Sequence, residues 1–318
     1  MKVKDYIGKN QATSIFGMYL RDHITEDSNV QVLTADMSAA ANLEMIQYRF
    51  PDKYTDVGIA EQNMLGICAG LASEGYRPIA TAQANFLTMR AFEMDRQFMG
   101  YMKKPIILVG INSGFLLQFM GNTHFAIEDI ALMRLIPGMT VLAPADGGAA
   151  AATIEAALEY DGPVYIRLTG MPGNTVYEEE CNYTIGKDVV LRDGDDVTLF
   201  ATGSMVFFSL RAAELLQSEY GINAKVVDVH TLKPLDTDTI RESKGSKLFV
   251  SVEEHSVIGG LGSAISDYVS AETGYPCVLK LGIQDRFSTL GDYNYLLEQH
   301  RLTPELISLD VATKYKSL

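Results

Sequence analysis

The sequence predicts an α/β protein with two doubly wound domains, the first of them built on a mainly parallel sheet. Short apolar runs that end in small or polar residues alternate with amphipathic helical patterns, as expected for a sheet wrapped by helices. The alternation stops after Gly170 and resumes near residue 188, and 318 residues suffice for two domains of ordinary size. We expect a larger domain over residues 1–175, a linker with a hairpin over 176–190, and a smaller domain over 191–318.

The expected strands are short apolar runs. They lie at 30–36, 77–83, 104–113, 139–146 and 163–170 in the first domain, and at 196–204, 224–232, 247–255 and 277–283 in the second. The alanine-rich pattern at 148–160 predicts a helix. Turn-forming residues, an acidic run and two short β segments predict the hairpin between the domains. In parallel sheets of this kind, ligands bind beyond the carboxyl ends of the strands.

The charge balance excludes several classes of partner. With 40 acidic and 26 basic residues the formal net charge is −14, whereas nucleic acids and anionic membranes require a basic surface. No apolar run reaches the ~20 residues that span a bilayer, and no apolar core of a signal peptide follows the N-terminal lysines. The cysteines Cys68, Cys181 and Cys277 are far apart, which favours reduced thiols in a cytoplasmic protein.

The segment DVGIAEQNMLGICAGLASEG (56–75) places an acid, Glu61, at the head of a helix with a buried face. Met64, Leu65 and Cys68 follow at helical spacing. An exposed carboxylate at this position is stabilised by the helix dipole by about 0.3–1 kcal/mol. The apolar neighbours of Glu61 instead imply burial, and a buried carboxylate needs a partner. No basic residue lies nearby in the sequence, so we expect that partner to be a ligand nitrogen.

A second segment, GNTHFAIEDIALMRLIPGMTVLAPAD (121–146), predicts a helix that begins close to His124. Thr123 is a candidate N-cap, and Glu128 and Asp129 fall in the early turns, where the helix dipole favours acids. A histidine in this position is either a functional group or a solvated surface residue, and the pattern alone leaves both open.

These segments, together with VEEHSVIGGLGSAI (252–265), resemble the C-terminal half of the transketolases, which use thiamine diphosphate. The resemblance implies a pyrimidine-binding domain followed by a transketolase C-terminal domain. It also implies that Glu61 hydrogen-bonds N1′ of the aminopyrimidine and so promotes the tautomer that activates the thiazolium ring. Glycines 259, 260 and 262 lack the spacing of a phosphate-binding loop, so we expect a tight turn and close helix packing there.

The resemblance assigns further residues to the site. Phe86 matches the aromatic that stacks on the pyrimidine ring, and Phe92 and Met89 are expected in the same cofactor-binding wall. His124 matches a histidine that contacts the substrate hydroxyls and moves protons. Arg167 matches a basic residue that holds a sugar phosphate, although a surface ion pair is the alternative. Without the resemblance, the aromatic residues would be read as core.

Two departures from the family pattern concern the substrate. Phe119 and Met120 stand where the family usually has Glu-Asp, and Asn112 replaces a histidine that contacts phosphate. We therefore expect Asn112 and Met120 to line an altered substrate site. The substrate is then either not a standard sugar phosphate or carries its anion in a different place.

The diphosphate-binding motif of the family, GDG with an asparagine about 30 residues on, has no match in this sequence. We expect a second polypeptide, an N-terminal transketolase subunit, to supply that domain and to hold Mg²⁺ or Ca²⁺, with no metal site in this chain. The family places the cofactor across a subunit interface, so an α2β2 assembly is expected.

Three other functions remain open from the sequence. The β subunit of a 2-oxoacid dehydrogenase has the same two domains but usually reads PIAEQGF where this chain has GIAEQNM. A 1-deoxyxylulose 5-phosphate synthase is closer, but is normally one long chain with DG before TH, and this pair is absent here. A non-catalytic binding partner is expected to have lost the glutamate or the aromatic wall, and both are present.

Overall fold

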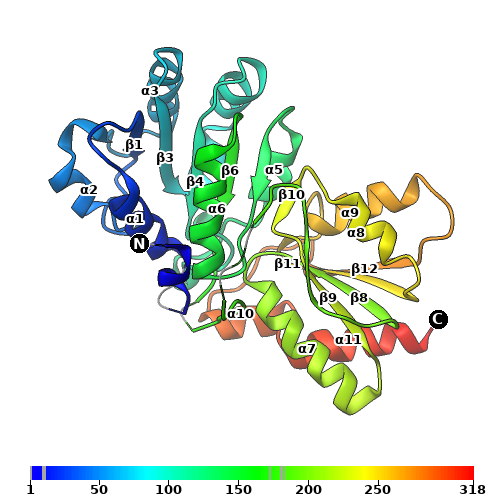
Figure 1. The fold of residues 1–318 in the computed structure, drawn as a ribbon. Coiled ribbons are helices and arrows are strands. Elements are labelled where there is room, and N and C mark those ends of the chain that lie inside the picture. The colour runs from blue at the N-terminus through cyan, green and yellow to red at the C-terminus, as the bar shows by residue number, and fades with distance from the viewer. Residues whose placement is uncertain (1, 9–11, 172, 180, 182) are drawn as a thin grey trace.

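The fold consists of two α/β units, one with a seven-stranded sheet and one with a five-stranded sheet (Figure 1). The structure is a computed structural model, and it describes residues 2–8, 12–171, 173–179, 181 and 183–318. The mixed α/β architecture with two mainly parallel sheets confirms the predicted fold class.

The first sheet has the strand order β10-β5-β6-β4-β3-β1-β2. Its strands are β1 (Val30–Thr34), β2 (Tyr54–Asp56), β3 (Arg77–Gln83), β4 (Ile107–Ile111), β5 (Thr140–Leu142), β6 (Val164–Arg167) and β10 (Thr231–Lys233). All neighbours are parallel except β10 and β5. All residues of β3 and β4 are buried, as expected for central strands covered on both faces.

Two layers of helices cover the first sheet (Figure 1). The α-helices are α1 (Ala12–His23), α2 (Glu44–Arg49), α3 (Glu61–Ser73), α4 (Phe92–Met94), α5 (Asp129–Leu135) and α6 (Gly147–Glu159). Shorter 3₁₀ and π segments lie at Val3–Tyr6, Pro51–Lys53, Phe86–Arg90, Asp95–Tyr101 and Gln118–Thr123. Strand residues alternate between two apolar cores: Val109 packs with α1 and α6, and Leu108 with α3 and α5.

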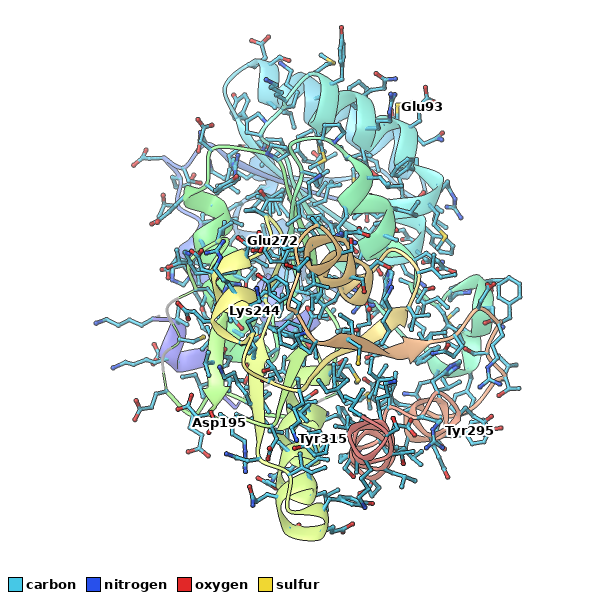
Figure 2. All side chains as sticks on the ribbon, turned by 90° about the vertical axis from the view of Figure 1, so that its right-hand side faces the viewer. Glu93, Asp195, Lys244, Glu272, Tyr295 and Tyr315 are labelled. Atoms are coloured by element: carbon cyan, nitrogen blue, oxygen red, sulfur yellow. The ribbon has the colours of Figure 1, made fainter. Side chains whose placement is uncertain are left out.

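The second sheet has the order β12-β11-β8-β9-β7. Its strands are β7 (Val189–Arg192), β8 (Val197–Ala201), β9 (Ala224–Asp228), β11 (Leu248–Ser256) and β12 (Cys277–Ile283), and its helices are α7 (Met205–Tyr220), α8 (Thr237–Glu242), α9 (Leu261–Ser270), α10 (Tyr293–Gln299) and α11 (Pro304–Lys316). Only β7 is antiparallel to its neighbour. Figure 2 shows Tyr315 on α11 beneath this sheet, and its hydroxyl donates to Asp196 Oδ1 at 2.9 Å.

The structure corrects two expectations about the connections. The hairpin predicted over 176–190 is absent from the described residues of that segment, because β7 pairs with β9 and not with a neighbour in the linker. The run 224–232 is also not one strand. It divides into β9, in the second sheet, and β10, which pairs with β5 in the first.

The strand β10 therefore links the two units through a shared sheet. One apolar core also runs through both, joining α3 and α5 to Phe249 on β11 and Leu261 on α9. In the part of the chain that the structure describes, no helix combines the length and apolar character needed to cross a membrane.

Candidate active site

Glu61 begins α3, as the sequence predicts, and its side chain is only 3% exposed. The chain reaches it through a tight turn after β2. Asp56 Oδ1 accepts hydrogen bonds from Gly58 N at 2.9 Å and Asp36 N at 3.0 Å, and Gly58 has a φ of +68°, which favours glycine. This turn directs the chain from the sheet edge into α3 and fixes where the buried carboxylate lies.

Arg90 is the partner of Glu61 in this structure, where no base nearby in the sequence was found and a ligand nitrogen was expected. Its Nη1 donates to Glu61 Oε2 at 3.0 Å and to Oε1 at 3.2 Å. The next residue of α3, Gln62, donates through Nε2 to the backbone carbonyl of Arg90 at 2.9 Å. The two segments are thus joined at adjacent positions, although Arg90 lies 29 residues further along the chain.

Phe86 lies directly beside this ion pair. The Arg90 guanidinium is placed over the Phe86 ring, 4.3 Å from its centroid. The Phe86 and His124 rings also meet edge to face, with centroids 5.4 Å apart. The structure therefore brings Glu61, Phe86 and His124, three residues expected in the site, into one continuous group with Arg90.

His124 does not head a helix, which corrects the sequence-based expectation. It follows the 3₁₀ segment Gln118–Thr123, and α5 begins only at Asp129. Its Nδ1 is 2.9 Å from the Thr123 hydroxyl, and Asn85 Nδ2 donates to the Thr123 carbonyl at 2.8 Å. Since Asn85 precedes Phe86, the same contact positions the aromatic ring and the histidine together.

The other residues expected in the cofactor-binding wall and in the substrate site differ in how exposed they are to solvent. Met89 is 42% exposed and Met120 is 54% exposed, whereas Phe92 is partly buried and packs on the core beside α3. Asn112 follows β4 and has a φ of +56°, an uncommon value that asparagine tolerates. Asn112 and Met120 sit in the chain between the end of β4 and His124, so their expected role in the substrate site stays a prediction.

Arg167 is placed differently from the expectation. It is 1% exposed, and its Nε donates to Asp129 Oδ2 at 2.9 Å. Its Nη2 donates to the carbonyls of Ala126 at 3.1 Å and Glu254 at 2.9 Å. Burial lowers the pKa of this guanidinium, but Asp129 and Glu254 outweigh that effect and raise it. A side chain enclosed and paired in this way does not fit the role of a phosphate ligand, because β6 directs it into the protein.

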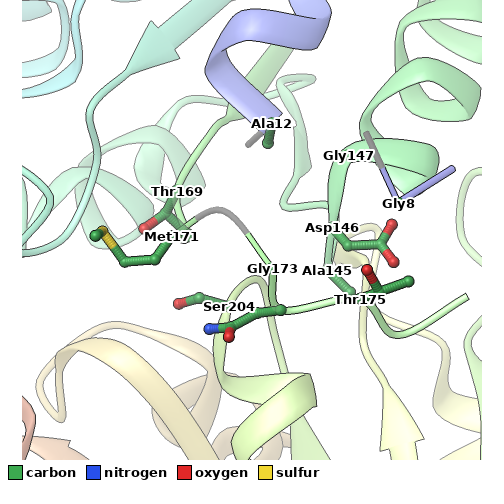
Figure 3. Close-up of a pocket in the computed structure, with 12 residues that line it drawn as sticks. Gly8, Ala12, Ala145, Asp146, Gly147, Thr169, Met171, Gly173, Thr175 and Ser204 are labelled. Carbon is green, nitrogen blue, oxygen red and sulfur yellow. The ribbon is translucent and has the colours of Figure 1, made fainter. Parts of the chain in front are cut away.

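Figure 3 shows a separate pocket, which is not a cofactor site. It encloses only about 20 Å³, room for about one water molecule. Its acid, Asp146, is fully used: Oδ1 caps α6 through Ala149 N at 2.8 Å, and Oδ2 accepts from Val176 N and Tyr177 N at 2.8 and 2.9 Å. Across the described ranges, no group of three His, Cys, Asp or Glu residues is arranged to hold a metal ion.

Family comparisons agree with this architecture. The family model described as transketolase, pyrimidine binding domain matches residues 9–171, and the transketolase C-terminal domain matches residues 186–307. The chain therefore belongs to the transketolase family. It is the C-terminal half of a transketolase, with the pyrimidine-binding domain first.

Individual relatives show how the chain compares in length. A 6-deoxy-6-sulfo-D-fructose transketolase subunit from Clostridium sp. strain MSTE9 is 37% identical over 91% of this chain and 89% of its own. A protein from Methanocaldococcus jannaschii, named as a transketolase C-terminal section, is 38% identical over 91% of each chain. The chain spans about half, 47%, of the 1-deoxy-D-xylulose-5-phosphate synthase of Heliobacterium modesticaldum, to which it is 35% identical.

A solved structure matches nearly end to end. It is named a split gene transketolase, inactive beta4 tetramer, and has a TM-score of 0.87 at 36% identity, with 98% of this chain and 99% of that chain covered. A transketolase from Pichia stipitis shares the fold, with a TM-score of 0.78 at 21% identity over 47% of its length.

Arg90 is the residue of this group that the sequence analysis missed. A signal was present, because Arg90 lies four residues after Phe86 in a segment with helical character, and side chains at that spacing share a face. The ion pair itself was not predictable, since it depends on how the π-helical segment Phe86–Arg90 packs beside α3.

Proposed function

We propose that this chain is the C-terminal subunit of a split transketolase, which transfers a two-carbon ketol unit from a ketose to an aldose using thiamine diphosphate. It works together with a separate subunit that binds the diphosphate through Mg²⁺ or Ca²⁺. The observation that carries the proposal is the buried Glu61 carboxylate at the head of α3, set beside the Phe86 ring and connected through it to His124.

The residues of this group fit an aminopyrimidine. The Arg90 guanidinium is planar, donates to Glu61 and lies over Phe86, so this space accepts a flat nitrogen donor with both kinds of contact. An aminopyrimidine offers the same combination: ring nitrogen and amino groups for the carboxylate, and an aromatic face for Phe86. Once bound, the cofactor supplies the carbanion chemistry. Glu61 holds the proton at N1′, and burial makes that hydrogen bond strong because water does not compete.

His124 is proposed to contact the substrate. The Thr123 hydroxyl lies 2.9 Å from Nδ1 and orients the ring. The Nε2 atom is then the one offered to a substrate hydroxyl, where it donates or accepts a proton. The edge-to-face contact between the His124 and Phe86 rings keeps this histidine beside the proposed cofactor position.

The substrate is proposed to be a ketose that is not recognised through Arg167. The enclosed ion pair of Arg167 with Asp129 removes the one anion-binding residue that the family pattern had offered. A relative of similar length is named as acting on 6-deoxy-6-sulfo-D-fructose. A sulfonated sugar is therefore included as a donor beside sugar phosphates in the test below.

Assembly with other subunits is part of the proposal, with α2β2 as the expected form. The solved relative is named as a tetramer of β chains that is inactive, which agrees with a need for a second kind of subunit. This chain also exposes large apolar side chains beside a groove of about 550 Å³, namely Leu135, Ile258 and Phe287. Such patches are typical of surfaces that meet another protein.

The test is to reconstitute the chain with its diphosphate-binding subunit and assay three reactions: ketol transfer, oxidative decarboxylation of a 2-oxoacid, and condensation of pyruvate with an aldehyde. Ketol transfer from xylulose 5-phosphate or 6-deoxy-6-sulfofructose is expected, and only from the pair. Turnover by the chain alone at the full rate contradicts the split assignment. Pyruvate condensation without ketol transfer supports the synthase alternative, and decarboxylation supports the dehydrogenase.

A further inference from the structure

We propose that Arg90 acts as an internal stand-in for the cofactor's aminopyrimidine and has to leave before thiamine diphosphate binds. This inference rests on the proposed function and adds a regulatory step to it. Two contacts carry it: the guanidinium satisfies the buried Glu61 carboxylate at 3.0 Å, and it covers the face of Phe86 at 4.3 Å.

The Arg90 guanidinium and an aminopyrimidine cannot occupy the site at the same time. A ring that stacks on Phe86 occupies the volume in which the guanidinium lies, since stacked planar groups approach to about the same separation. The carboxylate of Glu61 likewise has both oxygens directed to Nη1 of Arg90. Binding of an aminopyrimidine therefore exchanges one planar nitrogen donor for another at the same acid and the same ring.

Arg90, and not Glu61, is the group that moves. The side chain of Arg90 is 46% exposed, whereas that of Glu61 is 3% exposed. Figure 2 shows Glu93, three residues later, at the outer edge of the molecule, so this part of the helical run faces solvent. The guanidinium reaches water by rotation of its own side chain, while the Gln62 bond to its carbonyl keeps the backbone in place.

The arrangement has a use before assembly. A buried, unpaired carboxylate is strongly unfavourable, and Arg90 satisfies Glu61 while no cofactor is present. The same contact competes with thiamine diphosphate and lowers its apparent affinity, because the cofactor binds only to molecules in which Arg90 has moved away. The Arg90 side chain therefore partly determines the affinity for thiamine diphosphate.

The experiment measures thiamine diphosphate binding by titration calorimetry and thermal shift, with the chain reconstituted with the diphosphate-binding subunit. The variants are Arg90→Ala and Arg90→Lys, with Arg96→Ala as the matched control, an exposed arginine in the same helical run. Arg90→Ala is expected to tighten cofactor binding by about tenfold, the amount typical of a hydrogen bond to a charged group. Arg90→Lys is expected to fall between, since an ammonium keeps the charge without the flat, stacked geometry.

Thermal shift separates this role from a purely structural one. Without cofactor, Arg90→Ala is expected to unfold at a lower temperature than the wild type, because Glu61 loses its partner. Addition of thiamine diphosphate is expected to raise its unfolding temperature by more than it raises that of the wild type, since stabilisation follows affinity. A structural role alone lowers both temperatures and leaves the increment unchanged.

The outcomes are distinct. Unchanged or weaker cofactor binding in Arg90→Ala overturns the inference, while wild-type binding and turnover leave the proposed function standing. Equal tightening in Arg96→Ala also overturns it, because the effect is then one of general charge. Failure of every variant and of the wild type to bind thiamine diphosphate overturns the proposed function, and the inference with it.

Discussion

Glu61 and Arg90 show how a single buried acid shapes this site. The carboxylate is 3% exposed, and a charge in such a place is tolerated only with a partner. That partner, Arg90, lies in the same segment as Phe86. The positive charge and the aromatic ring are therefore positioned beside Glu61 by one element. At the scale of the residue, one flat group that donates hydrogen bonds, the Arg90 guanidinium, contacts both the buried acid and the aromatic ring.

We predict that Glu61→Gln folds normally but lowers ketol transfer by about 10²–10⁴-fold, the usual contribution of a positioned proton donor or acceptor. An amide keeps the shape of the side chain but does not hold a proton at N1′. The measurement is kcat of the reconstituted pair, with circular dichroism as the check on folding. Glu74→Gln, the same change at the exposed end of α3, serves as the control. Full activity of Glu61→Gln refutes the role assigned to this carboxylate.

We predict that Arg167→Ala acts on stability and not on substrate affinity. Removing one partner of a buried ion pair leaves Asp129 uncompensated, so the free energy of unfolding should fall by about 3–5 kcal/mol in urea titrations. Arg211→Ala, which breaks an exposed pair with Glu214, should cost less than about 1 kcal/mol. A stable Arg167→Ala with a raised KM for sugar phosphates would restore the original substrate assignment.

The sequence predicted these residues unequally. Glu61 was identified because small apolar residues on both sides made burial evident from the pattern. Arg167 was expected to bind phosphate only because of the family resemblance, whereas in the structure it is the last residue of β6 and pairs with Asp129 on α5. These two residues are 38 positions apart in the sequence, so their pairing cannot be predicted without the three-dimensional fold.

Individual elements are fixed by buried polar groups as well as by apolar faces. Glu253 on β11 accepts hydrogen bonds from Leu261 N at 2.7 Å and Gly262 N at 2.8 Å, so this acid satisfies the start of α9 from within the protein. The glycine-rich turn before α9 is therefore a close-packing device, in agreement with the sequence analysis. Burial raises the pKa of Glu253 to about 7, although the two amides oppose the shift.

Asp228, the last residue of β9, connects the linker to the second sheet. Its Oδ2 accepts hydrogen bonds from the hydroxyls of Tyr177 and Tyr183, both at 2.7 Å. Burial raises its pKa from 3.8 to about 7, and the two tyrosine hydrogen bonds act in the opposite direction. A folded-state pKa above the unfolded value means that the folded chain binds the proton more tightly, so this group's stabilisation is present at low pH and is lost as pH rises towards 7.

We predict that Asp228→Asn gains stability relative to the wild type as pH rises from 4 to 8. The neutral amide removes the cost of ionising a buried acid, a difference of a few kcal/mol and about 4 at most. Urea titrations across this range measure it. Asp195→Asn, a change at the exposed residue labelled in Figure 2, should give a curve parallel to that of the wild type. A parallel curve for Asp228→Asn would contradict the prediction.

The strand β10 shows where element prediction failed. The run AKVVDVHTL (224–232) reads as one continuous strand because no glycine or proline interrupts it. The chain instead leaves the second sheet after Asp228 and joins the first sheet at Thr231. His230, between them, is buried and stacks on Tyr183 with centroids 3.9 Å apart. Only the three-dimensional pairing with β5 distinguishes the two halves of this run.

For the molecule as a whole, the two units are expected to unfold together. Leu232 on β10 is 1% exposed and packs in the core that runs between the sheets. We predict that Leu232→Ala lowers the stability by about 2–5 kcal/mol. Hydrogen exchange should then accelerate in peptides from 139–168 as well as from 248–283.

Calorimetry supplies the second measurement of this prediction. The wild-type chain should show one transition, and Leu309→Ala, at an exposed site on α11, should change stability by less than about 1 kcal/mol. Two separate transitions, or acceleration confined to the second sheet, would show that the units are independent.

Two α/β units on one chain ordinarily move relative to each other about their linker, because the interface between them is small and polar. Here the crossing strand β10, the shared apolar core and the Arg167 hydrogen bond to the Glu254 carbonyl remove any hinge between them. The two α/β units therefore move together as one rigid body. Any rearrangement when a ligand binds then falls to side chains such as Arg90, and not to a movement of one unit against the other.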